Sequence, residues 1–197
     1  MEIVDIGEAL PQSLLVKDVL GKSQFSVLQE IIFSNRFPWF FLPDTTYGSG
    51  VSTDSSTHGF RHQLMFDNEN KSEVGNLFTP LAWIVADCLD KKCVNVAAMH
   101  ANFMENYNKE LRPLPHIDRE TCDKQALANC WTAIFYMNDS SGDTLFFDDS
   151  KKNIVHRIKP VENTMVIFPS STFHSASLPS TNPFRCVINI NIDVVDF

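Results

Sequence analysis

Long apolar runs are missing from this sequence, which argues against a membrane-spanning segment. No stretch approaches the roughly 18 consecutive apolar residues that a spanning helix needs. The N-terminus also lacks a basic segment followed by an apolar run, which is the pattern of a secretory signal. We therefore expect a chain that is neither secreted nor inserted into a membrane.

Paired cysteines are also missing. The chain has 5 cysteines, none of them in a C-x-x-C pair, and an odd number fits no closed disulfide framework. A cytoplasmic location, where thiols stay reduced, is expected. Cys130 and Cys186 lie in apolar segments and are expected to be inert buried thiols.

Positive charge is scarce, because 16 Lys and Arg residues face 24 Asp and Glu residues and the formal net charge is -8. A nucleic acid or an anionic membrane would need a local basic patch. The short lysine pairs at 91–92 and 151–152 have Asp neighbours and are expected to be solvated surface. Charge therefore weighs against both kinds of partner, and it leaves the oligomeric state open.

What the chain has is the material for one packed core. Its 197 residues are 44% hydrophobic, include 16 Phe and are only 20% charged, which is typical of a globular domain. We find no internal repeat. We therefore expect a single domain over 1–197.

Two helices are predicted in the first half of the chain. Apolar residues recur at three- and four-residue spacing between Gly21 and Pro38, which indicates one buried stripe. The same spacing recurs after Asn76, the expected N-cap, and stops near Asp90. The stripes consist of Phe25, Leu28, Ile31 and Ile32, and of Leu77, Leu81, Ile84, Val85 and Cys88.

Residues 43–75 are rich in Gly, Ser, Thr, Asp and Asn, a composition that favours turns over regular ladders. We predict a long loop here. Loops of this length are uncommon in compact domains unless they are disordered or functional, so an active-site lid is one hypothesis.

From Val94 onward, short apolar runs alternate with turn-rich stretches, which predicts a β-sandwich or jelly roll. Helices of the length that separates parallel strands are missing, which argues against a doubly wound parallel sheet. The chain thus divides into a helical and loop part, about 1–93, and a jelly-roll core, about 94–197. The predicted strands cover 94–104, 130–138, 144–148, 153–158, 164–168 and 185–195.

His116 and Asp118 place an imidazole and a carboxylate two residues apart. In extended backbone both side chains leave the same face, with Cα atoms about 6.6 Å apart, so both can reach one ion. The strand over 164–168 and the turn after it can deliver His174 as a third ligand. Two histidines and one carboxylate form the facial triad that leaves positions of iron(II) open. An H-x-D pair alone is weak evidence.

Arg185 strengthens this interpretation. It opens an apolar run, 186–190, that is predicted to be a buried strand. A guanidinium at the start of a buried strand is costly unless it meets an anion, and its fork matches a carboxylate.

Together these segments resemble the 2-oxoglutarate and iron(II)-dependent oxygenase superfamily, most closely its prolyl-hydroxylase-like branch. The resemblance covers roughly 94 to 195, and several ordered motifs make it specific. They are HID at 116–118, CWTAIFYMN at 130–138, SGDTLFF at 141–147, NTMVIFPSSTFHSA at 163–176, and Arg185 in NPFRCVINI.

The resemblance implies a mainly β fold with flanking helices, a double-stranded β-helix of the jelly-roll, cupin-like type. Fe(II) would lie at its mouth on His116, Asp118 and His174. Together with O2, the co-substrate 2-oxoglutarate would be decarboxylated to succinate and CO2 to drive hydroxylation. The substrate would be a protein or peptide residue, an amino acid or another small metabolite.

The resemblance also assigns the co-substrate site. The distal carboxylate of 2-oxoglutarate would pair with Arg185. Tyr136 would be a further donor to it, since 132, 134 and 136 share one strand face, and Thr144 would line the same pocket. Relatives commonly carry a Tyr on the strand before H-x-D where this chain has Phe103, and Asn102 could substitute if the register differs by one residue.

Two other functions use the same three ligands. Oxidative nucleic-acid demethylases share the fold but typically carry a second Arg shortly after the co-substrate Arg, and Arg185 is followed by Cys-Val-Ile-Asn-Ile-Asn. A cupin-like binding protein or zinc hydrolase has no use for Arg185. The remaining candidates are expected to be ordinary surface or loop residues: His58, His62, His100, His156, Arg61 and Arg112.

Overall fold

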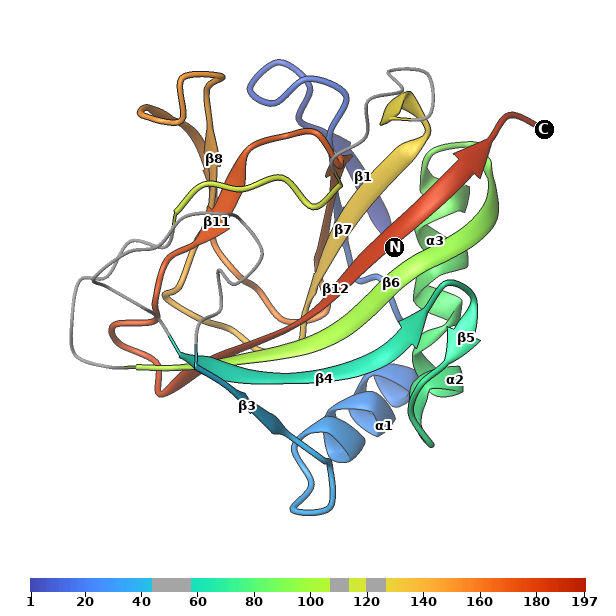
Figure 1. The fold of residues 1–197 in the computed structure, drawn as a ribbon, viewed down its shortest axis with the longest axis vertical. Helices are drawn as coiled ribbons and strands as arrows, with labels where there is room; N and C mark the ends of the chain where they lie inside the picture. Colours follow the sequence, from blue (N-terminus) through green and yellow to red (C-terminus); the bar gives the residue numbers. More distant parts are fainter. Residues whose placement is uncertain (44–57, 107–113, 120–126) are drawn as a thin grey trace.

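Two antiparallel sheets dominate the computed structural model, which describes residues 1–43, 58–106, 114–119 and 127–197 (Figure 1). The larger sheet has the order β1-β2-β10-β7-β12-β6-β4-β3, with β5 paired to β4, and the smaller has the order β11-β8-β9. The strands are β1 (Glu2–Asp5), β2 (Leu14–Lys17), β3 (Phe40–Leu42), β4 (Gly59–Phe66), β5 (Glu69–Asn70), β6 (Lys92–Glu105), β7 (Cys130–Tyr136), β8 (Thr144–Phe147), β9 (Ile154–Ile158), β10 (Met165–Pro169), β11 (His174–Ala176) and β12 (Phe184–Val195).

Strand β12 shows how the larger sheet separates two environments. Its residues alternate between the faces because the side-chain period of a strand is two. Ile188 and Ile190 enter the core under the helices, whereas Val187 packs with the smaller sheet. Arg185 and Asn189 share the face of Val187 and line a pocket. This inner face therefore carries the polar residues.

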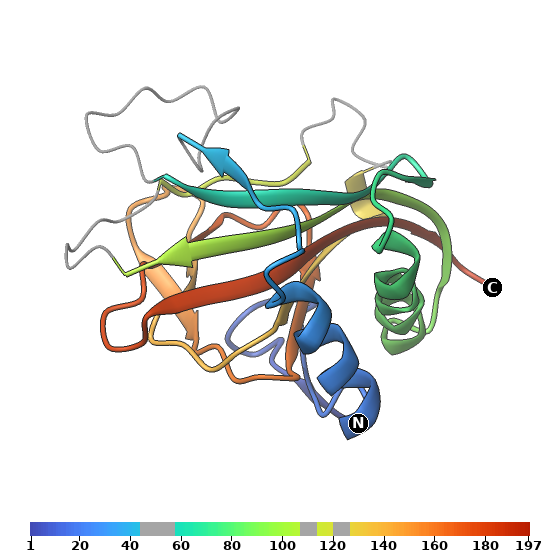
Figure 2. The same cartoon turned by 90° about the horizontal axis from the view of Figure 1, so that it is seen from below.

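The outer face of the larger sheet is covered by helices. These are α1 (Lys22–Ile32) and α3 (Pro80–Cys88), preceded by the short α2 (Gly75–Phe78). Figure 2 shows α1 and α3 on the same side of β12, β6 and β4. Phe25 of α1 meets Phe135 of β7 edge to face, with ring centroids 5.8 Å apart. Of the predicted stripe of α1, Phe25, Leu28 and Ile32 are buried and Ile31 is partly buried. No helix among the described residues has the length and apolar character to cross a membrane.

The smaller sheet closes over the inner face of the larger one. Phe146 and Ile158 of the smaller sheet join residues of β7, β10 and β12 in a second core. Phe146 packs edge-on against Phe168, with centroids 5.0 Å apart. Two facing antiparallel sheets with helices on one outer side form the predicted double-stranded β-helix.

The predicted loop over 43–75 is wrong in its second half. Residues 59–66 form β4, which pairs along β6, and 69–70 form β5. The polar composition is concentrated in 44–57, which lies outside the described residues, as does the lid hypothesis. Phe60, Leu64 and Met65 supply the apolar positions that stabilise β4.

The N-terminal strands were not predicted. β2 pairs with β10 through Val16 and Met165, and β1 pairs with β2 at the edge of the larger sheet. Each strand has only four residues, too few for a clear alternation. The first third of the chain therefore contributes strands as well as helix.

The expected helix start at Asn76 is also wrong. Asn76 lies inside α2, and Thr79 is the N-cap of α3, with Pro80 at the first helical turn. Proline fits there because its missing N–H would have no helical partner. The helix ends at Cys88, near the predicted Asp90.

Two histidines depart from the expected surface role. His62 lies buried in β4, and its Nε2 forms a 2.7 Å hydrogen bond with the Ser72 hydroxyl. His100 is partly buried in β6, opposite Asn189 of β12. Strand pairing placed both in the larger sheet. The predicted strand over 94–104 already contained His100, whereas His62 fell in the segment predicted to be a loop.

Candidate metal centre

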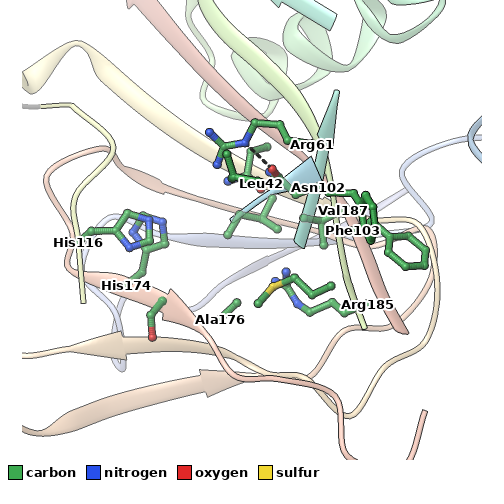
Figure 3. A pocket seen from close by; sticks show the side chains of 14 residues that line it. Leu42, Arg61, Asn102, Phe103, His116, His174, Ala176, Arg185 and Val187 are labelled. Carbon is green, nitrogen blue, oxygen red and sulfur yellow. Dashed lines mark hydrogen bonds between the residues drawn. The ribbon is translucent and has the colours of Figure 1, made fainter. Parts of the chain in front are cut away.

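His116 and His174 lie side by side because residues 114–119 run antiparallel to β11. The backbone N–H of each residue donates to the carbonyl oxygen of the other, at 3.0 and 2.9 Å. The centroids of their imidazole rings are 4.6 Å apart. Figure 3 shows both rings together at one end of a pocket. The structure thus brings His174 to the H-x-D segment.

Asp118 joins this pair. One ligand atom from each of His116, Asp118 and His174 lies within 4.8 Å of the others. Oδ1 of Asp118 is 3.7 Å from Nε2 of both imidazoles, which is too long for a hydrogen bond. Two metal–ligand bonds of about 2.1 Å can span that separation. The three groups are therefore arranged as ligands of one ion.

The second oxygen of Asp118 is held by neighbouring strands. Oδ2 accepts hydrogen bonds from the Thr132 hydroxyl at 3.1 Å and from the Asn191 amide at 2.9 Å. Burial alone would raise the pKa of Asp118, but His174, His116 and these two donors hold that pKa below its ordinary value. The carboxylate is therefore ionised, with Oδ1 aimed at the histidines.

The buried nitrogen of His174 provides a test of whether a cation fits. Its Nδ1 donates to the carbonyl oxygen of Thr172 at 3.0 Å, which leaves Nε2 unprotonated. Nε2 is buried without a hydrogen-bond partner among the described residues. Burial lowers the pKa of His174 to about 4, so the ring is neutral near pH 7. A buried acceptor without a donor is costly, so the donor set fits a divalent metal such as iron(II).

A pocket extends from the two histidines along the inner face of the larger sheet (Figure 3). On β7, Thr132 contacts Asp118, and Tyr136 lies about 13 Å further along the strand. The side chains of 132, 134 and 136 share this face, as predicted. The lining residues are Leu42, Phe60, Arg61, Asn102, Phe103, Met104, His116, Ile134, His174, Ser175, Ala176, Arg185, Val187 and Asn189.

Arg185 lies in the pocket beyond the histidines and is only 3% exposed. Its Nε donates to the Gly142 carbonyl at 2.9 Å, and one terminal nitrogen donates to the Thr144 hydroxyl at 3.0 Å. Tyr136 is hydrogen-bonded to the same hydroxyl at 2.8 Å. No carboxylate among the described residues forms an ion pair with Arg185. Burial lowers the pKa of Arg185, and its guanidinium has no anionic partner in the part of the chain that the structure describes.

Tyr136 is suited to donate a hydrogen bond in this cluster. Burial raises the pKa of its phenol to about 12, even though Arg185 and Thr144 act in the opposite direction. The hydroxyl is therefore protonated near pH 7. The three residues predicted for the co-substrate site, Arg185, Tyr136 and Thr144, lie together.

The register of β6 places Asn102 on the inner face, and Phe103 also contributes to the lining of the pocket. Asn102 is opposite Val187 of β12, whereas Phe103 is opposite Cys186 and packs on the helix side. Phe103 stacks on Phe184, with ring centroids 4.8 Å apart. Of the two residues that the sequence offered for this position, Asn102 is therefore the one that shares a face with Val187.

Arg61 does not lie on the solvated surface that the sequence predicted. It is opposite Asn102 on β4, and its Nε donates to the Asn102 amide oxygen at 2.8 Å (Figure 3). Burial lowers the pKa of the guanidinium, while Asp118 raises it. Pairing with β6 gives Arg61 this place in the pocket wall. Arg112 lies outside the described residues.

The sequence contained a usable signal for the asparagines of β12. Over 188–192 isoleucine alternates strictly with asparagine. Asn189 lines the pocket and Asn191 binds Asp118. A period of two places them opposite the isoleucines, so this pattern could have identified both.

Comparison with known families gives one match. Residues 102–193 match the family described as the 2OG-Fe(II) oxygenase superfamily. The matched region contains His116, Asp118, His174 and Arg185. No curated protein matches the chain.

Solved structures share the fold at low identity. An oxidoreductase of the 2OG-Fe(II) oxygenase family from Burkholderia pseudomallei has a TM-score of 0.66 and 8% identity, covering 92% of this chain and 84% of that chain. A Trichoplax adhaerens prolyl hydroxylase, in complex with a hypoxia inducible factor peptide, has a TM-score of 0.63 and 12% identity, covering 92% and 83%. A Pseudomonas putida prolyl-4-hydroxylase has a TM-score of 0.57 and 12% identity, covering 92% and 91%.

Proposed function

Because residues 102–193 match the 2OG-Fe(II) oxygenase superfamily, we propose that the chain couples oxidative decarboxylation of 2-oxoglutarate to hydroxylation of an organic substrate. Its cofactor is Fe(II), and its co-substrates are 2-oxoglutarate and O2. The substrate is a peptide residue, an amino acid or another small metabolite. The prolyl hydroxylase neighbour that is in complex with a peptide supports the inclusion of peptides.

In this proposal His116, Asp118 and His174 hold the iron. The bound iron supplies the site at which O2 and 2-oxoglutarate react. Thr132 and Asn191 fix the rotamer of Asp118, so that Oδ1 points toward both histidines. The hydrogen bond from His174 Nδ1 to Thr172 fixes the ring and its tautomer.

Arg185 binds the distal carboxylate of 2-oxoglutarate. Gly142 and Thr144 hold its guanidinium in place, which reduces the entropy lost on binding. Tyr136 and Thr144 supply hydroxyls beside it. The apolar Ile134 and Val187 line the pocket and exclude water from the carbon chain of 2-oxoglutarate.

One observation carries the proposal: a buried guanidinium without a carboxylate partner among the described residues lines the same pocket as the two histidines. A buried charge of this kind is costly unless a ligand pairs with it. A metal-binding protein of the same fold without oxygenase activity would gain nothing from it.

The test is anaerobic addition of Fe(II) and 2-oxoglutarate, followed by O2. We expect a visible metal-to-ligand charge-transfer band and then O2-dependent release of succinate. His116→Ala should lose the band, and Arg185→Ala should weaken 2-oxoglutarate binding by about 1.5–3 kcal/mol.

The matched controls are His156→Ala and Arg157→Ala, both on β9 and outside the pocket. Both should keep the band and the affinity. Metal binding without a band would favour the cupin-like alternative. An unchanged 2-oxoglutarate affinity in Arg185→Ala would remove Arg185 from its role.

A further inference from the structure

A second guanidinium faces the pocket, and the proposed chemistry does not use it. Arg61 lines the cavity together with His116, His174 and Arg185. In Figure 3 it lies on the wall formed by β4 and β6, away from Arg185. By strand spacing its Cα is roughly 12 Å from that of Arg185, because the two differ by two strands and two residues.

The orientation of Arg61 is fixed at one nitrogen. Nε donates a hydrogen bond to the amide oxygen of Asn102. Within the described ranges of the chain, Nε is the one nitrogen of Arg61 with a hydrogen-bond partner, and no carboxylate there forms an ion pair with Arg61. The terminal fork is therefore available to a ligand in the pocket. A fork held in this way suits bidentate binding of a carboxylate.

The charge of the loaded site favours an anion. When Fe(II) and 2-oxoglutarate are bound, the two positive charges of the metal are balanced by the two negative charges of the co-substrate. The negative charge of Asp118 balances the positive charge of one of the two arginines, Arg61 and Arg185. One positive charge is left, and Arg185 is already committed to the co-substrate, so the excess charge belongs to Arg61. A ligand with one negative charge would neutralise it in a site of low dielectric constant.

The wall around Arg61 is apolar. Leu42 of β3 and Phe60 of β4 also line the pocket, and Met104 lines it on β6. Such a wall favours a hydrocarbon body next to the charged group.

We propose that Arg61 binds a carboxylate of the substrate and that the substrate is a monocarboxylate with an apolar body. This inference rests on the proposed oxygenase function. The same carboxylate chemistry is present in a free acid, an amino acid and the C-terminus of a short peptide. Asn102 acts as a positioning residue, since it holds Arg61 through Nε.

The test uses the full-length protein with anaerobic Fe(II) and saturating 2-oxoglutarate, so that Arg185 is occupied. The probes are aliphatic and aromatic carboxylic acids, the corresponding amino acids and short peptides. Each probe is compared with the amide of the same compound. Binding is read from broadening of the probe's proton resonances by the paramagnetic iron and from changes in the charge-transfer band. Turnover is read from succinate release after O2 is added.

We expect carboxylates to bind and to stimulate turnover, with their amides weaker by about 10- to 100-fold. Whether acids, amino acids or peptides respond identifies the source of the carboxylate. Arg61→Gln should raise the KM of the responding probe by a similar factor, with little change in the affinity for 2-oxoglutarate. Arg61→Lys should recover part of the loss, and Asn102→Ala should have a smaller effect on the same KM.

Two results would overturn the inference. One is equal binding of acids and amides to the wild type, a result that needs no variant to fold. The other is a weaker 2-oxoglutarate affinity in Arg61→Gln, which would assign Arg61 to the co-substrate. The exposed control Arg157→Gln should match the wild type. Failure of the proposed function itself is distinguishable, because the wild type would then show no charge-transfer band before any probe is added.

Discussion

The hydroxyl of Thr132 donates a hydrogen bond to Oδ2 of Asp118 across 3.1 Å, so β7 orients a residue that lies outside the regular strands. Asn191 donates to the same oxygen and also to the Thr132 hydroxyl. These contacts leave Oδ1 directed at the two histidines. The geometry of the candidate metal centre thus depends on residues from two strands of the larger sheet.

Thr132→Val should weaken Fe(II) binding by about 10- to 100-fold, because it removes the hydroxyl that fixes Asp118 while keeping the side-chain shape. Anaerobic titration with Fe(II) measures the affinity. Thr164→Val is a suitable control, since Thr164 donates to the Val161 carbonyl and does not contact Asp118. Equal affinities in the two variants would contradict the orienting role of Thr132.

Tyr136→Phe should weaken 2-oxoglutarate binding by about 1.5–3 kcal/mol, because the protonated phenol would no longer support the carboxylate beside Arg185. The charge-transfer band, titrated with 2-oxoglutarate, reports this affinity. Thr144 also loses a buried partner, so the free energy of unfolding should fall by about 1 kcal/mol. A loss of stability without any loss of affinity would make Tyr136 a core residue only.

Gly142→Ala should displace Arg185. A Cβ at this position would lie 2.7 Å from the Ser177 carbonyl oxygen and 3.1 Å from Cδ of Arg185. We expect lower 2-oxoglutarate affinity and a loss of about 1–3 kcal/mol in the free energy of unfolding. Gly21→Ala is the matched control, because its Cβ would meet only Gln24, at 3.4 Å. Denaturant unfolding and the charge-transfer titration test both effects, and normal behaviour of Gly142→Ala would show that the turn adapts.

The metal-free protein should lose stability as the pH falls from about 6.5 to about 4. Burial lowers the pKa of His100 to about 4, helped by Arg61, and burial lowers the pKa of His174 to about 4. In this window the unfolded chain binds protons that the folded chain excludes, so acid favours unfolding. Each imidazole contributes a slope of about 1.4 kcal/mol per pH unit.

Denaturant unfolding across this pH range, with a chelator present, measures that slope. His100→Asn should reduce it by about the contribution of one imidazole. A slope that does not change between the variant and the wild type would mean that His100 titrates normally in the folded state.

Fe(II) should raise the Tm of the wild type under anaerobic conditions, because a ligand that binds only the folded state stabilises it. At a concentration of about 100 times Kd the gain is about 2.7 kcal/mol. His174→Ala should abolish the shift and His156→Ala should keep it. A shift that survives in His174→Ala would place the metal elsewhere.

The sequence by itself determined which residues could form the candidate metal centre and that the second half of the chain is mainly β. The spacing of His116 and Asp118 put two ligands on one side of an extended segment, and the apolar run after Arg185 predicted a buried cation. The strand pattern beyond residue 94 predicted the jelly roll, because alternation depends on near neighbours. The Asn–Ile alternation in β12 was equally local.

Only the tertiary structure decided which residues meet. The bridge between His116 and His174 joins segments 58 positions apart in the sequence. Asn102 and Arg61 face the pocket because β6 registers with β4 and β12, and a slip of one residue would have turned Phe103 inward instead. That register includes an irregularity between Gln63 and Met65 and is set by contacts across the whole sheet. No local pattern of the chain contains that information.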